Sequence, residues 1–290
     1  MRPLAGADVA RLVTLAAIWG ASFYFFRILA PVLGPVVTAA SRVIIGGLAL
    51  VAWLRAIGYD AGVVRHGRHY AVIGVVNSAI PFVLFGWAAL TLPASYSAIL
   101  NATAPLFSAV LGAIWLGERL TVRKLVGLAV GMSGVVLVTR AGPVVVDARV
   151  LLATAACLAA TFCYAATGVY VKLRAAAAPP RGVAAWSQLA AGAALLPLLP
   201  AAPPIGPVTP PIIAAVLGLA LMCSSVAYLL YFRLMSDLGP TRTMTVTFLI
   251  PVFGMLWGAL FLGESVTGPM LAGAALIVAG TVLIMRRAPA

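Results

Sequence analysis

The chain has 290 residues, of which 63% are hydrophobic and only 9% are charged, and its mean hydropathy is +1.13. A soluble domain cannot carry this composition, because its surface must face water. The lipid bilayer is therefore the predicted surrounding of this chain. The net charge of +13 comes from basic residues that are dispersed rather than clustered, which argues against a nucleic-acid partner.

Ten apolar runs follow one another, each long enough to cross a hydrocarbon core of about 30 Å. The breaks between them are too short for a soluble catalytic or nucleotide-binding domain, and no GxxxxGK[ST] phosphate loop occurs. ATP-driven pumping by this chain alone is therefore not expected. The predicted membrane spans are 10–29, 34–54, 70–90, 94–116, 122–140, 150–171, 183–200, 210–232, 240–262 and 268–285.

The basic residues fall unevenly on the two sides of these spans. Most of the nineteen Lys and Arg lie in the even-numbered breaks and at the termini, whereas the opposite side holds only Arg27, Arg140 and Arg149. Cytoplasmic loops carry an excess of Lys and Arg. The sequence therefore predicts a multi-pass protein of the bacterial inner membrane with both termini in the cytoplasm.

The second span contains the most unusual polar residue. Arg42 lies about eight residues inside that span, where a charge is costly unless it finds a partner, faces water or reaches the headgroups. Recognition of an anion or carboxylate is one interpretation. The other is that the long side chain reaches the periplasmic headgroups across roughly 12 Å of helix.

Aromatic side chains in three later spans offer stacking surface for an apolar or aromatic substrate. By their depth within the spans, Phe82, Tyr164 and Tyr228 are predicted to line a cavity. Other aromatic residues lie near span ends, where they serve as interfacial anchors.

The fourth and ninth spans each contain a polar column that leads to a proline. Spacing of four residues places the column on one helix face, and each proline leaves a backbone carbonyl near mid-membrane without its usual donor. A substrate cavity would satisfy these groups, although Ser and Thr also bond within membrane bundles. The duplication favours a cavity lining with hinges at the prolines. The columns are Ser97, Asn101 and Pro105, and Thr243, Thr247 and Pro251.

The fifth and tenth spans carry small residues at helical spacing. Gly127 and Gly131 form a GxxxG pattern, and Ala275 with Ala279 gives a small-xxx-small face. Such faces let membrane helices approach closely. The sequence leaves open whether they join the two halves of the chain or form a homodimer.

An internal repeat relates the two halves. An offset of 146 residues places PLFSAVLGAIWLGERLT, from Pro105, on PVFGMLWGALFLGESVT, from Pro251, without a gap. At nearly the same offset Arg27 faces Lys172. Five helices per repeat invert the second copy, as in many secondary transporters. The predicted repeats are residues 1–143 and 144–290.

Each repeat ends its proline helix with a glutamate, Glu118 in the first copy and Glu264 in the second. Because both lie at helix ends, a structural role in binding loop amides or nearby arginines is one interpretation. Conformational gating is the other.

The opening Trp19-Gly20-Ala21-Ser22-Phe23, Arg42, and the duplicated proline helix that ends in Leu-Gly-Glu resemble the EamA-type branch of the drug/metabolite transporter superfamily. The resemblance covers nearly the whole chain. It implies a ten-helix metabolite carrier, with amino-acid export as the first expectation. Within this pattern Trp19 and Ser22 join the candidate substrate-binding residues.

The predicted protein is thus a secondary transporter of small metabolites that works by alternating access, without a cofactor or metal. A multidrug or aromatic-compound exporter and a membrane assembly protein without transport activity are the alternatives. No Asp, Glu or His lies in the central part of a predicted span, so neither an intramembrane enzyme nor a conventional buried carboxylate proton relay is expected.

Overall fold

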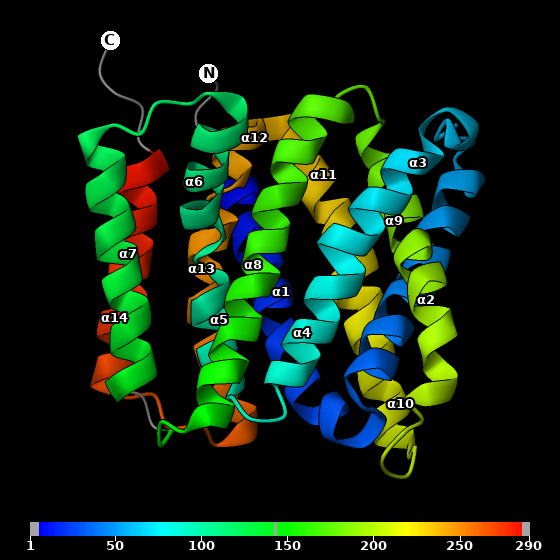
Figure 1. Ribbon diagram of the computed structural model, residues 1–290. Helices are drawn as coiled ribbons and strands as arrows, with labels where there is room; N and C mark the ends of the chain where they lie inside the picture. The colour runs from blue at the N-terminus through cyan, green and yellow to red at the C-terminus, as the bar shows by residue number, and fades with distance from the viewer. Residues whose placement is uncertain (1–5, 142–143, 286–290) are drawn as a thin grey trace.

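The computed structural model describes residues 6–141 and 144–285, which form helices and contain no strand (Figure 1). Nine helical segments in these residues are long and apolar enough to cross a membrane, and a tenth apolar helix, Val246–Leu262, is shorter. The predicted ten-helix membrane fold is confirmed.

The first repeat consists of five membrane crossings. The first two are single helices, the third contains a π-helical segment, the fourth is broken once, and the fifth is a single helix. They are α1 (Gly6–Leu33), α2 (Pro35–Ala56), α3 (Val63–Gly74) with η1 (Val75–Ala79) and α4 (Ile80–Ala88), α5 (Ala94–Asn101) with α6 (Ala104–Leu116), and α7 (Val122–Ala141).

The second repeat has the same plan. Its third crossing again contains a π-helical segment, and its fourth is again broken. The elements are α8 (Ala148–Arg174), α9 (Pro180–Leu195) with η2 (Leu196–Ala201), α10 (Pro210–Leu217) with η3 (Gly218–Val226) and α11 (Ala227–Leu238), α12 (Pro240–Thr243) with α13 (Val246–Leu262), and α14 (Gly268–Met285).

The two repeats run in opposite directions through the bundle. We call the end where α1 begins and α14 ends the terminal face, and the opposite end the far face (Figure 1). Helix α1 begins at the terminal face and α8 begins at the far face. The odd number of crossings in the first repeat therefore produces the predicted inversion.

The breaks in the two proline crossings lie at different positions. Helix α6 begins at Ala104, so Pro105 lies in the first turn of the helix. Backbone N–H groups in a first turn have no partner within the helix, so the N–H that proline lacks costs no hydrogen bond there. Pro251, in contrast, lies inside the continuous α13, and the second crossing breaks before Val246. The duplicated proline therefore does not by itself fix where the helix breaks.

Helices α7 and α14 pack closely through glycines. A Cβ atom at Gly134 would lie 2.6 Å from the backbone oxygen of Gly273, and Gly280 approaches the backbone of Gly127 and Gly131 equally closely. The GxxxG face thus joins the two repeats within one chain. Ala275 and Ala279, in contrast, are exposed on the opposite side of α14, so they do not join the repeats, and a homodimer through this face stays a prediction.

Candidate functional site

The Arg42 side chain lies inside the bundle and does not reach the headgroups, since only 6% of the residue is exposed. Its Nε donates a hydrogen bond to Ser224 Oγ at 3.1 Å, and one terminal nitrogen donates to the Cys223 carbonyl oxygen at 3.3 Å. The guanidinium carbon lies 4.0 Å from the centre of the Phe82 ring and 5.5 Å from that of Phe26. Arg42 is therefore held between aromatic faces and the π-helical segment η3.

A glycine one turn further along α2 brings these groups together. A Cβ atom at Gly46 would lie 2.8 Å from the Ala220 carbonyl oxygen and 2.9 Å from Ser224 Cβ, so only glycine allows this approach. Ser225 Oγ also donates to the Gly46 carbonyl oxygen at 3.1 Å. π-Helical bulges often occur at functional sites. Close packing of α2 on η3 positions Ser224 for Arg42.

Two tyrosines and a glutamine complete the surroundings of Arg42. The phenol groups of Tyr164 and Tyr228 lie within electrostatic range of the guanidinium. Tyr164 stacks on Phe85, with ring centres 6.3 Å apart. The Gln188 side-chain amide donates to the Tyr228 hydroxyl at 3.4 Å, and its buried oxygen accepts no hydrogen bond in the part of the chain that the structure describes.

No carboxylate neutralises Arg42 in residues 6–141 and 144–285, which include all six acidic side chains. Each of the six contacts a basic side chain or a backbone amide elsewhere. These are Asp8, Asp60, Glu118, Asp147, Asp237 and Glu264. The Arg42 guanidinium carries five N–H donors, and two take part in the bonds to η3. A buried cation with spare donors is suited to binding an anionic ligand.

The comparisons with known proteins agree with this architecture. The profile of the EamA-like transporter family matches residues 9–140 and again residues 151–286. The chain belongs to the EamA-like transporter family. It is a transporter of small metabolites, and the expected family resemblance is confirmed.

Relatives of this EamA-like transporter include two proteins with names that mention amino acids. A "Probable terminal-alkyne amino-acid exporter" of Streptantibioticus cattleyicolor is 28% identical over 278 residues, which cover 95% of this chain and 92% of that protein. A "Probable amino-acid metabolite efflux pump" of Salmonella typhimurium is 27% identical over 205 residues, which cover 65% of this chain and 66% of that protein. A solved structure that is 20% identical in sequence aligns with a TM-score of 0.67 over 97% of this chain and 96% of that structure, and this likeness supports the fold.

The transporter brings four of the predicted binding residues together: Arg42, Phe82, Tyr164 and Tyr228. The other predicted residues lie elsewhere in α1 and in the proline crossings. Trp19 packs against Tyr231 with ring centres 5.7 Å apart. Ser22 is buried in α1, beside Cys223 of η3.

The two polar columns of the transporter mostly bond to their own surroundings. Ser97 Oγ is 3.8 Å from the Cys157 thiol, which donates to it. Thr243 and Thr247 donate to backbone carbonyls in their own turns at 2.8 Å. Asn101 ends α5 and is half-buried. A lining role for these columns remains a prediction.

Three residues around Arg42 were not predicted from the sequence: Phe26, Ser224 and Gln188. Gln188 is the only glutamine of the chain and lies within a membrane span, so its amide was a usable signal. Phe26 and Ser224 gave no such signal, because phenylalanine and serine are common in membrane helices and their proximity to Arg42 arises from packing.

Glu118 lies at the terminal face of the transporter, outside the membrane spans, and contacts Lys124 Nζ and Lys172 Nζ at 3.3 Å each. Partial burial raises the pKa of its carboxyl, but the hydrogen bonds and charges of the two lysines lower it by more, so the pKa is below its usual value. A lowered folded-state pKa stabilises the protein above the unfolded-state pKa, and this contribution disappears as the pH falls through the folded-state value.

Replacement of Glu118 by Gln is therefore expected to lower the melting temperature by a constant amount between about pH 7 and pH 5. The difference from the unmodified protein should shrink toward zero on acidification below about pH 4, because the carboxylate is then protonated in both states. Thermal unfolding in detergent across this pH range measures the effect. A difference that grows on acidification would contradict it.

Proposed function

We propose that this transporter exports amino acids or closely related amphipathic carboxylates from the cytoplasm, and that Arg42 binds the substrate carboxylate. The supporting observation is the buried guanidinium that no acidic side chain of the described chain neutralises. A charge inside a membrane protein is costly and usually marks a substrate pathway. A carboxylate that accepts two parallel N–H bonds suits the planar arginine fork.

The other groups around Arg42 fit the rest of an amino acid. A substrate ammonium can donate to the buried oxygen of Gln188, which lies beside Tyr228 and lacks a donor in the described residues. The faces of Phe26 and Phe82 offer apolar surface next to the guanidinium. The site thus combines a cation, a neutral acceptor and aromatic surface, as an amphipathic zwitterion requires.

The charge distribution supports an orientation in the membrane, and the names of two relatives support the direction of transport. The terminal face carries most of the basic residues, so the positive-inside rule supports a cytoplasmic terminal face and a periplasmic far face. The names of the Streptantibioticus and Salmonella relatives, an exporter and an efflux pump, support movement from the former to the latter.

Counterflow into proteoliposomes tests the substrate class. Vesicles loaded with a mixture of amino acids should accumulate labelled amino acids, whereas the matching amino-acid amides, which keep the ammonium and side chain, should not exchange. The amides lose the anionic group for Arg42. Equal exchange of acids and amides would contradict the proposal and favour a second candidate, an exporter of uncharged aromatic compounds, which the Phe26 and Phe82 faces support.

A further inference from the structure

Glu264 connects the two repeats at the far face. Gly263, with φ of 64°, reverses the chain after α13, and the Glu264 amide donates to the Gly258 carbonyl oxygen at 3.1 Å. The carboxylate then folds back over Gly258 and reaches the start of α5. It accepts hydrogen bonds from Ala94 N at 2.6 Å, Ser95 N at 2.9 Å and Ser95 Oγ at 2.6 Å. A negative charge is thus held by the unpaired amides at a helix beginning.

Glu118 has the same backbone arrangement but different partners. Gly117 has φ of 66°, the Glu118 amide donates to the Gly112 carbonyl oxygen at 3.1 Å, and the carboxylate lies over Gly112. Its oxygens, however, contact Lys124 and Lys172 rather than a helix beginning. Two equivalent glutamates therefore occupy two different states in one structure.

The packing around the two glutamates differs in the same way. At the far face α5 packs along α13, with Ala98 directly against Gly254. The repeat offset of 146 relates this buried pair to Met244 and Ser108, which are both exposed. In the described part of the chain α12 does not pack along α6. The two proline crossings therefore pack against each other at the far face, whereas α12 and α6 do not pack in the same way at the terminal face.

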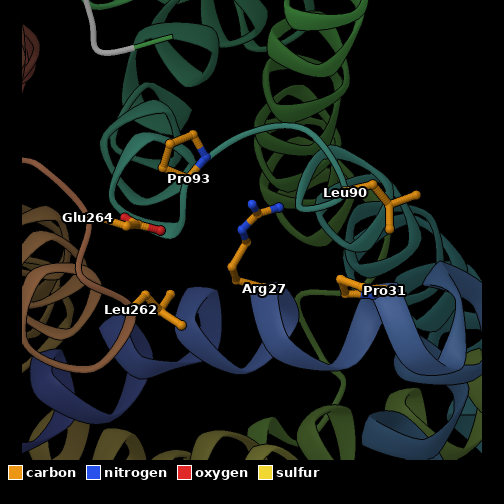
Figure 2. A pocket seen from close by; sticks show the side chains of 6 residues that line it. All are labelled: Arg27, Pro31, Leu90, Pro93, Leu262 and Glu264. Carbon is orange, nitrogen blue, oxygen red and sulfur yellow. The ribbon is translucent and has the colours of Figure 1, made fainter. Parts of the chain in front are cut away.

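Arg27 is the far-face counterpart of Lys172 in the repeat alignment. It donates to the Ala89 carbonyl oxygen at 2.5 Å and lies across a pocket of about 530 Å³ from Glu264. Figure 2 shows the Arg27 guanidinium between Glu264, which has Pro93 and Leu262 beside it, and Leu90 on the other side of the pocket. At the terminal face, where the proline crossings do not pack together, the glutamate is paired with a basic residue, and at the far face, where they do, these two groups are apart.

We propose that Glu264 is the latch of the far gate: it closes the gate by binding the beginning of α5, and the gate opens when Glu264 transfers to Arg27. The contact of Glu118 with Lys172 at the terminal face, where the proline crossings do not pack together, is the counterpart of the state with Glu264 on Arg27. In both states the carboxylate faces positive charge, either helix amides or a guanidinium, so neither position leaves it unpaired. This inference needs transport by alternating access but not the identity of the substrate.

Distances between spin labels in lipid nanodiscs test the latch without substrate. Cysteines replace Leu90 and Val266, which are 40% and 37% exposed, in a protein with Cys157, Cys163 and Cys223 changed to Ala. Transfer of Glu264 from α5 to Arg27 changes the distance between positions 90 and 266, so the closed and open states give two separate populations in the distance distribution. Ser95→Ala removes one bond to the carboxylate in the closed state only, and we expect about a tenfold rise in the open-to-closed ratio.

A second substitution in the Ser95→Ala protein distinguishes a latch from a general loss of packing. Arg27→Gln removes the partner of the open state, so we expect the ratio to return toward the closed value by about tenfold. Arg149→Gln, which removes an exposed far-face arginine outside the pocket, should leave the ratio unchanged. An unaltered distribution in folded Ser95→Ala protein, or no reversal by Arg27→Gln, would overturn the proposal. Failure of amino-acid counterflow alone would contradict the proposed substrate but not the proposed role of Glu264.

Discussion

Replacement of Arg42 by Met should abolish exchange of amino acids and at the same time make the protein more stable. Arg42 is 6% exposed and no carboxylate of the described chain neutralises its guanidinium, so burial of the charge is costly without substrate. Methionine fills a similar volume without the charge. We expect the free energy of unfolding to rise by about 1 kcal/mol, at the lower end of the range of about 1–4 kcal/mol reached with buried ion pairs, because Ser224 loses its donor.

Substrate binding by the Arg42→Met protein should weaken by at least about thirtyfold, since loss of a desolvated charge pair costs about 2 kcal/mol or more. Counterflow in proteoliposomes and the shift in melting temperature on adding amino acids measure this effect. Arg42→Lys is the matched control: it keeps the charge but loses the planar fork over Phe82, so intermediate binding is expected. Full exchange by the Met variant would exclude Arg42 from the substrate site.

Replacement of Gly280 by Ala should destabilise the contact between the repeats. A Cβ atom there would meet the backbone oxygen of Gly127 and lie 2.6 Å from the Gly131 amide nitrogen, and backbone atoms cannot move aside as a flexible side chain can. Helices α7 and α14 would have to separate. We expect a loss of about 1–3 kcal/mol in the free energy of unfolding, as in other overpacked interiors.

Gly168→Ala in α8 is the matched control for this loss. It makes the same chemical change within a membrane helix, but nothing lies within 4 Å of the added Cβ atom. Alanine forms helices better than glycine by up to about 1 kcal/mol, so this variant should be unchanged or more stable. Denaturant titrations of both variants in one detergent measure the difference. Equal destabilisation would show that the close approach of α14 to α7 is not what Gly280 provides.

The chain carries the information for its topology in local patterns. A helix needs about 20 apolar residues to cross the bilayer, so each span is visible in the sequence. The segments around Pro105 and Pro251 are still similar enough to be aligned without a gap. For that reason the ten crossings and their inversion could be predicted without coordinates. The depth of Arg42, Phe82, Tyr164 and Tyr228 within their spans identified four members of the cluster for the same reason.

The partners of these residues could not be read from the chain. Ser224 lies 182 positions from Arg42, and their contact depends on the missing side chain of Gly46 and on the π-helical turn of η3. Glu264 contacts the start of α5 across 170 positions, whereas its counterpart Glu118 contacts lysines.

The sequence by itself determined the membrane environment, the number of crossings and their inverted repeat, and the deep polar and aromatic residues, because each depends on hydropathy or periodicity along the chain. Only the tertiary structure decided which small residues meet between α7 and α14, and that Arg42 lies against η3 instead of reaching the headgroups. It alone also decided that two equivalent glutamates have different partners. The physical reason is that contacts between helices depend on interhelical distance and rotation, which hydropathy does not encode.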